Sequence, residues 1–182
     1  VGIIMPCNSK RNFTTDKDDG MEVAGQFSIE TRMVDLTAQR EMVLSDLQGV
    51  TAVNDTAMSN IAPRLRMITL YAVAAAENRI VAGTGNRSER HMGYFTKWGD
   101  GACDFNPISD LTVTEVFAFL RYLHAPSSIV EKAPSAGLYG GQTDEEDMGI
   151  NYQAIDQYLE TGAATEQDLS IIERYHSRSE HK

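Results

Sequence analysis

The chain has 182 residues, close to the size of one compact domain that can bury a substantial core. Hydrophobic residues make up 42% of it and charged residues 23%, a composition that excludes disordered and low-complexity proteins. The formal net charge of −10 argues against nucleic acid as a partner, because nucleic-acid-binding surfaces are basic.

The first half of the sequence predicts two strands and one long helix. Residues 1–5 (VGIIM) form an apolar run that ends at a proline, which indicates a buried strand. Residues 14–30 have weak helical character, residues 31–37 predict a second strand, and residues 38–57 give no clear pattern. From Met58 onward, apolar residues recur at spacings of three and four, which predicts an amphipathic helix, with Pro63 near its first turn.

The second half alternates a strand with helices and a long connection. Residues 79–82 (RIVA) predict a short strand that opens into a glycine loop. The TVTE run at 112–115 is a capping-box pattern at the start of a helix, and another helix is expected near Thr165. Residues 125–150 are rich in glycine and proline, and we interpret them as a long functional loop. This order predicts an α/β protein with an open, Rossmann-like parallel sheet and helices on both faces.

Two features bear on the compartment. Cys7 and Cys103 are too few for a disulfide framework, so we expect two unreactive core thiols. The longest apolar stretch, residues 70–76, is too short to cross a bilayer. We therefore expect a cytoplasmic protein with no membrane partner.

Positive charge gathers around the glycine loop. The segment from Ser59 to Trp98 contains six basic residues and only two acidic ones, although the chain as a whole is acidic. In and just after the GTG turn, Thr84 offers a hydroxyl and Glu89 a carboxylate, groups that suit a phosphate and a hard cation. A small anionic ligand would explain this combination. An ordinary turn glycine and a solvated charged surface are the alternatives.

Three long runs resemble one family. GTGNRSERHMGYFTKWGDG at 83–101, PSAGLYGGQTDEEDMGINYQAIDQYL at 134–159 and RSEHK at 178–182 are similar to ammonia-dependent NAD synthetase, and the resemblance extends over residues 1–182 as a single domain. It implies the adenine-nucleotide α-hydrolase-like fold and a homodimer. It also implies a reaction in which ATP activates the nicotinate carboxylate of deamido-NAD as an acyl-adenylate, which ammonia converts to the amide of NAD.

The resemblance also assigns roles to individual residues. Thr84 and Ser135 would contact ATP, and Glu89 would bind Mg²⁺. The residues that would contact deamido-NAD are Arg64, Lys97, Asp104, His181 and Lys182. Arg64 and Arg66 lie about 200° apart on a helix and cannot face one ligand together. Because Arg64 borders the apolar stripe, we assign the substrate contact to it and expect Arg66 at the surface or at a subunit contact.

The sequence departs from the family in two places. The family's SGGxDS pyrophosphate loop, expected before the first strand, does not occur in it, so we interpret the chain as an incomplete form of the domain. Val113 stands where relatives usually carry a lysine that contacts ATP. These departures leave open a catalytically silent nucleotide-binding fragment, or another amidotransferase of the same adenylating fold, as alternatives.

Overall fold

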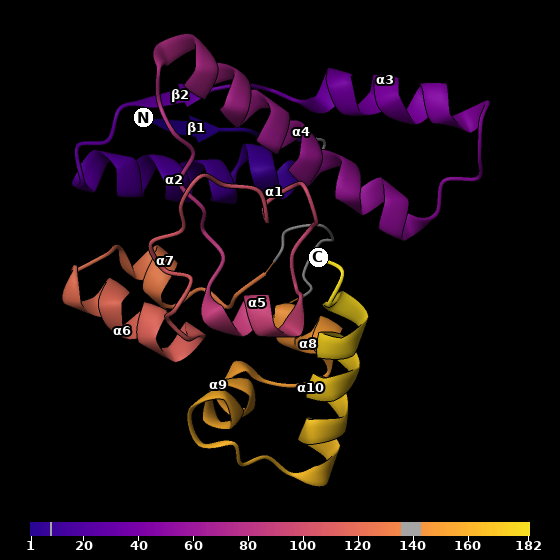
Figure 1. The fold of residues 1–182 in the computed structure, drawn as a ribbon. Coiled ribbons are helices and arrows are strands. Elements are labelled where there is room, and N and C mark those ends of the chain that lie inside the picture. Colours follow the sequence, from indigo (N-terminus) through magenta and orange to yellow (C-terminus); the bar gives the residue numbers. More distant parts are fainter. Residues whose placement is uncertain (8, 136–142) are drawn as a thin grey trace.

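The computed structural model describes residues 1–7, 9–135 and 143–182, and most of its regular structure is helical (Figure 1). None of the helices within these residues is long and apolar enough to span a membrane. In chain order the elements are β1 (Gly2–Ile4), α1 (Lys10–Phe13), α2 (Thr15–Gln26), β2 (Thr31–Met33), α3 (Thr37–Gln48), α4 (Asp55–Glu77), α5 (Arg87–Met92), α6 (Val113–Tyr122), α7 (Ser127–Val130), α8 (Asp144–Met148), α9 (Tyr152–Thr161) and α10 (Glu166–Ser179).

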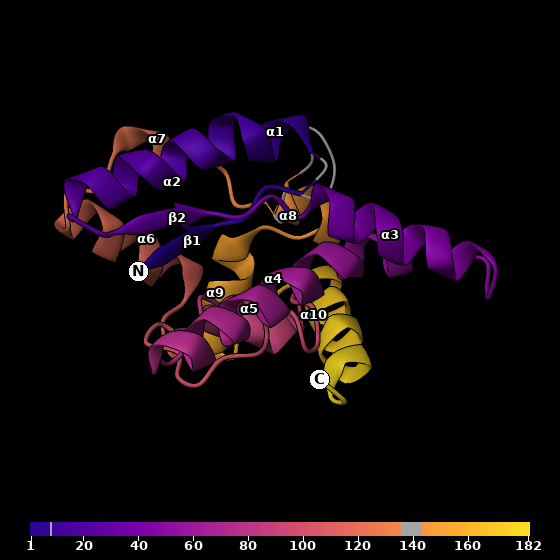
Figure 2. The ribbon, with the colours of Figure 1, turned by 90° about the horizontal axis from the view of Figure 1, so that it is seen from above.

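The two strands form a parallel pair. Gly2 lies opposite Thr31 and Ile4 opposite Met33, and α1 and α2 make the crossover that parallel strands require. Figure 2 shows β1 and β2 between α2 on one side and α4 on the other. The strands predicted at 1–5 and 31–37 are therefore confirmed, and so is a parallel sheet with helices on both faces.

The strand predicted at 79–82 is reduced to one isolated bridge, in which Ala82 pairs in parallel with Phe105. The Gly83 N–H donates to the Phe105 carbonyl at 2.7 Å, and the chain then turns toward α5. A Cβ at Gly83 would lie 2.6 Å from the Cys103 sulfur. Only glycine allows the two segments to approach this closely, which explains part of the glycine loop without any ligand.

Helix α4 differs from its prediction in two ways. It begins at Asp55 behind an Asn54 cap, so Pro63 lies inside the helix and not in its first turn. The apolar stripe read from the sequence is also not uniformly buried. Ile68 is 58% exposed, and Ala72 and Ala75 are exposed as well. Because the carboxyl-terminal part of this stripe faces solvent, periodicity alone misidentified the inner face of the helix.

Two segments are more regular than expected. Residues 38–57, which gave no clear pattern, include most of α3. The loop interpretation of residues 125–150 is wrong for the described part, which contains α7 and α8; residues 136–142 lie outside the described residues. Helix α8 begins with a capping box between Thr143 and Glu146, a pattern visible in the sequence as TDEE.

The core has two parts. Helices α5, α6, α8, α9 and α10 enclose the larger, which is formed by Met92, Val113, Met148, Ile150, Tyr152, Ile155 and Ile172. The smaller contains Cys7, Leu36 and Ala62 beneath the strands. Burial raises the pKa of the Cys7 thiol, as expected of a core thiol, whereas Cys103 is only half-buried. The helix starts predicted at 112 and 165 are confirmed by the side-chain caps of α6 and α10.

Candidate active site

A cavity of about 590 Å³ lies where β1, α1, α2, α4 and α6 meet the start of α5. Thr84, Glu89 and Ser135, the three residues assigned to ATP and its cation, all line it. Val113 lines it too, at the first turn of α6. The glycine turn, the start of α5 and the segment before residue 136 are far apart in sequence but converge on one hollow.

Glu89 is held in this cavity by the cap of its own helix. The Asn86 N–H donates to Glu89 Oε2 at 2.9 Å, and the Glu89 N–H donates to Asn86 Oδ1 at 2.9 Å. Burial, together with the nearby carboxylates of Asp144 and Asp100, raises the pKa of Glu89 to about 7, against the opposing effect of the Asn86 hydrogen bonds. A cation beside Glu89 would relieve this unfavourable setting for a negative charge.

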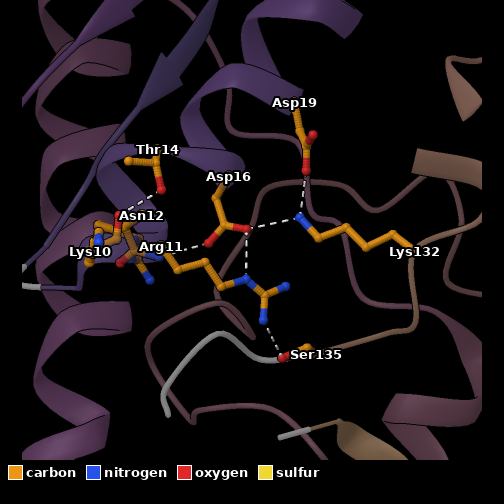
Figure 3. Close-up of polar contacts among 9 residues, drawn as sticks. Lys10, Arg11, Asn12, Thr14, Asp16, Asp19, Lys132 and Ser135 are labelled. Carbon is orange, nitrogen blue, oxygen red and sulfur yellow. Dashed lines mark hydrogen bonds and ion pairs between the residues drawn. The ribbon is translucent and has the colours of Figure 1, made fainter. Parts of the chain in front are cut away.

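One wall of the cavity is an ion-pair network (Figure 3). Asp16 Oδ1 accepts from Arg11 Nε at 3.1 Å and from Lys132 Nζ at 2.9 Å. Lys132 also donates to Asp19 at 2.6 Å, and Arg11 Nη1 donates to Ser135 Oγ at 3.2 Å. Asp16 therefore links α1 and α2 to the segment that carries Ser135. Burial alone would raise the pKa of Asp16, but the hydrogen bonds from Lys132 and Asn12 lower it below its ordinary value.

Arg66 extends the same wall, contrary to its expected place at the surface or a subunit contact. Its Nε donates to the Met5 carbonyl and its Nη2 donates to Asn12 Oδ1, both at 3.2 Å. It is half-buried and lines the cavity, whereas Arg64 is exposed. The two arginines do face apart, as the helical geometry requires. The expected place of Arg66 was wrong because part of the apolar stripe that served as the reference is exposed, whereas the substrate contact of Arg64 stays a prediction.

Four of the residues assigned to deamido-NAD lie in a second group, which we call the carboxyl-terminal cluster: Arg64, Lys97, His181 and Lys182. Arg64 Nε donates to the Lys97 carbonyl at 3.3 Å, and Lys97 Nζ donates to the His181 carbonyl. Lys182 Nζ donates to the carbonyls of Gly93 at 2.6 Å and Phe95 at 2.8 Å. Burial lowers the pKa of Lys182, and the charge of Asp100 opposes this effect.

Helix α5 connects the cavity to the carboxyl-terminal cluster. Glu89, in its first turn, lines the cavity, and Gly93, which ends the helix, accepts the hydrogen bond from Lys182. Asp104, the fifth assigned residue, is engaged elsewhere. It accepts from the Val81 N–H at 2.7 Å and from the Tyr71 hydroxyl at 3.4 Å, beside the isolated bridge.

The residues that could hold a metal ion are few. The described part of the chain contains no group of three or more His, Cys, Asp or Glu side chains placed to bind one. Two carboxylates line the cavity: Glu89, which is half-buried, and Asp16, which is paired with Arg11 and Lys132. Such a site suits Mg²⁺, which is commonly held by one or two carboxylates together with the phosphates of a nucleotide.

Sequence comparisons identify the family. The family model for NAD synthase matches residues 1–182. An NH₃-dependent NAD⁺ synthetase from Carboxydothermus hydrogenoformans is 46% identical, over all of this chain and 74% of that protein. The solved structure of an NMN synthetase from Francisella tularensis is 40% identical with a TM-score of 0.93, over 98% of this chain and 74% of that one. The NAD⁺ synthetase of Burkholderia pseudomallei is 29% identical with a TM-score of 0.73, over 98% of this chain and 67% of that one. The chain belongs to the NAD synthase family.

Proposed function

We propose that this protein is a carbon–nitrogen ligase that amidates deamido-NAD with ammonia and ATP, releasing NAD, AMP and pyrophosphate. The observation that carries the proposal is the 46% identity to an NH₃-dependent NAD⁺ synthetase over the whole chain. The cavity and the carboxyl-terminal cluster, joined by α5, offer separate places for two large anionic substrates. A silent fragment or another amidotransferase is not favoured, because curated relatives with high identity carry the same name.

In the first step, an oxygen of the nicotinate carboxylate attacks the α-phosphorus of ATP. The bond from that phosphorus to the bridging oxygen breaks, and pyrophosphate leaves. Ammonia then attacks the acyl carbon, AMP leaves with the former carboxylate oxygen, and one proton is released. Negative charge builds on the phosphate oxygens in the first step, so fixed cations are the main requirement. Four cationic residues line the cavity within the described part of the chain: Arg11, Lys17, Arg66 and Lys132.

In this proposal Thr84 and Ser135 contact ATP, and Glu89 holds Mg²⁺ with the phosphates. Mg²⁺, when bound, would neutralise charge that develops on the phosphate oxygens. The residues present fit such an ion, because Glu89 is a half-buried carboxylate with two further acidic groups, Asp144 and Asp100, near it. The polar wall would meanwhile keep Ser135 in place through Arg11.

Deamido-NAD would lie along the carboxyl-terminal cluster with its nicotinate end toward the cavity. Lys97 and Lys182 already donate to backbone carbonyls, but an ammonium group has three donors and can still meet a phosphate or carboxylate. Arg64 and His181 would complete this surface, and Asp104 would hold the bridge segment beside it. Helix α5 would set the separation of the two substrates.

The exposed stripe of α4 supports a homodimer. Ile68, Ala72 and Ala75 recur at helical spacing and face solvent in the single chain. A second copy would remove this apolar face from water. We further place the protein in the cytoplasm, where ATP is available and where its two cysteines would remain free thiols.

A mononucleotide acceptor is the second candidate. The Francisella tularensis structure with a TM-score of 0.93 is that of an NMN synthetase, whereas the Burkholderia pseudomallei NAD⁺ synthetase has a TM-score of 0.73. An enzyme that makes NMN with ammonia would amidate nicotinate mononucleotide, which lacks the adenylate half of deamido-NAD. The chemistry at the carboxylate is the same, so only the acceptor differs.

A direct assay tests both candidates. The protein is incubated with ATP, Mg²⁺ and ammonium, with either deamido-NAD or nicotinate mononucleotide, and NAD, NMN and AMP are quantified by chromatography. We expect NAD and AMP in equal amounts, a higher kcat/KM for deamido-NAD than for the mononucleotide, and little product when glutamine replaces ammonium. A preference for the mononucleotide would support the second candidate. No AMP with either acceptor would contradict both.

A further inference from the structure

Behind the cavity, a buried carboxylate on α9 connects three helices. Asp156 is 3% exposed and Ser88 is 0% exposed, and the Ser88 hydroxyl donates to Asp156 Oδ1. The other oxygen, Asp156 Oδ2, accepts from the backbone N–H of Thr114 at 2.8 Å and from its hydroxyl at 2.6 Å. Both oxygens of this carboxylate therefore bind groups of other helices, Ser88 on α5 and Thr114 on α6.

These bonds also complete the start of α6. The first helical N–H, that of Val113, donates to Ser88 Oγ at 3.2 Å. The next N–H, of Thr114, donates to Asp156, and the N–H of Glu115 donates to Thr112 Oγ1 at 3.3 Å. A negative charge at a helix amino terminus is favourable, so α6 helps to anchor the Asp156 carboxylate. Asp156 does not line the cavity, and the proposed reaction does not use it directly.

Ser88 is the neighbour of Glu89 in the first turn of α5. The capping box with Asn86 sets Glu89 relative to its own helix, but it does not fix α5 relative to the rest of the protein. The Ser88–Asp156 bond provides that connection at the adjacent residue. A carboxylate that must meet a metal ion and nucleotide phosphates tolerates little displacement, because the geometry of such ligands depends on the groups that orient them.

We propose that Asp156 is a positioning residue of the reaction: through Ser88 it holds Glu89 where Mg²⁺ and ATP are bound together. This inference rests on the proposed function, since it assigns the cation to Glu89. It predicts that loss of the Asp156–Ser88 bond weakens the binding of ATP with Mg²⁺, but not the binding of ATP alone or of the acceptor. A purely structural role would lower the stability of the fold without this selectivity.

The experiment uses Asp156→Asn and Ser88→Ala. The asparagine keeps the size of the side chain but places an N–H₂ group where an acceptor is needed, and the alanine removes the link between Asp156 and α5 together with the acceptor of the Val113 N–H. Calorimetric titration with ATP is carried out with and without Mg²⁺. In both variants we expect affinity in Mg²⁺ to fall about 10–100-fold, and affinity in EDTA to change less than about twofold. The KM for deamido-NAD should stay within about twofold of wild type while kcat falls.

Asp168→Asn is the matched control. Asp168 also accepts a hydroxyl hydrogen bond in the first turn of a helix, from Thr165 at 2.7 Å, but it is only half-buried, on α10. Its titrations should match those of wild type. If Asp156→Asn does not fold, Ser88→Ala decides alone, because the Thr114 bonds to Asp156 remain.

The proposal is overturned if the folded variants bind ATP in the presence of Mg²⁺ as tightly as wild type does. It is also overturned if the affinity of wild type for ATP is the same with and without Mg²⁺. The titrations need no turnover. A protein that makes no NAD but shows the Mg²⁺-selective loss therefore contradicts the proposed function and still supports the role of Asp156.

Discussion

At the scale of single residues, the surroundings of Glu89 and its proposed role as a metal ligand favour different protonation states of its carboxyl group in the ligand-free protein. Its carboxylate caps α5 through the Asn86 N–H, and it does so in a half-buried place near two other acidic groups. Burial therefore favours the protonated form, whereas a divalent cation needs the charged one. The cost of holding the charge before the ligand arrives is measurable as a dependence of stability on pH.

The pKa of Glu89 is about 7 in the folded protein, against an ordinary value of 4.5. The folded state therefore binds this proton more tightly, and wild type loses stability as pH rises from about 4.5 to 7. Glu89→Gln has no proton to lose, so in EDTA it should gain about 3 kcal/mol relative to wild type between pH 4.5 and pH 8. Urea unfolding at pH 4.5 and pH 8 measures the gain. Glu146→Gln, at the same capping-box position of α8 but exposed, is the matched control for loss of the capping carboxylate itself. Equal effects of Glu89→Gln at both pH values would contradict the prediction.

Asp16 shows the opposite shift and serves as the centre of the polar wall. Its side chain is 28% exposed and its pKa is lowered, so its stabilising effect is present at neutral pH and is lost as pH falls through that lowered pKa. Asp16→Asn should reduce the free energy of unfolding at pH 7 by about 1–2 kcal/mol. Asp18→Asn breaks an ion pair with Lys17 in which Asp18 is 70% exposed, and it should cost less than about 0.5 kcal/mol. If urea unfolding gave both variants the same stability, the polar wall would not stabilise the segment that carries Ser135.

At the scale of elements, the end of α5 is the most constrained turn. Gly93 has a φ of +62°, and a Cβ there would lie 2.0 Å from Ser179 Cβ on α10. Gly149 ends α8 with a φ of +73°, but a Cβ there would meet nothing within 4 Å. The two glycines share the left-handed conformation and differ only in the neighbour, so they make a matched pair.

Gly149→Ala should cost about 1 kcal/mol, the penalty for a side chain in the left-handed region. Gly93→Ala should cost more, because Ser179 and the adjoining chain end must move. That movement displaces Lys182, so the KM for deamido-NAD should rise at least about fivefold while the KM for ATP changes little. Thermal unfolding and steady-state kinetics of both variants provide the comparison. If the two substitutions changed stability and the KM for deamido-NAD equally, the contact between Gly93 and α10 would not contribute to substrate binding.

Elements with explicit end signals were predictable from sequence, and those defined by tertiary contacts were not. The capping boxes at Thr112 and Thr143 are equally clear in the structure, yet only the first was recognised, because the second follows a glycine-rich run. The strand at 79–82 failed for a physical reason. Its partner is a single residue, Phe105, and no local pattern records how far a pairing continues.

The site shows the same division. Thr84, Glu89 and Ser135 could be assigned because they lie in long motifs that resemble a family. The polar wall could not, since Asp16 and Lys132 meet across more than 100 residues of sequence. Arg66 was misplaced because the reference stripe on α4 includes positions that face solvent. Acidic residues of the 10–19 segment pair with Lys132, three residues before Ser135. This pairing can be recognised only in the folded protein, where both segments meet at the cavity.

At the scale of the whole molecule, the proposed dimer can be tested by a substitution in the exposed stripe of α4. Ile68 is 58% exposed on this helix, and a charge there would have to enter an apolar interface. Ile68→Glu should therefore convert a dimer of wild type into a monomer at micromolar concentration, with the fold retained. Tyr122→Glu, at a 77% exposed position on α6, should leave the oligomeric state unchanged. Sedimentation velocity of the three proteins decides, and a wild-type monomer, or a dimer in Ile68→Glu, would contradict the proposed interface.

The proposed reaction passes through an acyl-adenylate, and an isotope measurement tests this intermediate directly. Deamido-NAD labelled with ¹⁸O in the nicotinate carboxylate is converted with ATP, Mg²⁺ and ammonium, and the products are analysed by mass spectrometry. We expect AMP to carry one ¹⁸O and NAD to keep the other, because the carboxylate oxygen that attacks the α-phosphorus leaves with AMP. Formation of ADP with the label in inorganic phosphate, or of AMP without label, would contradict it.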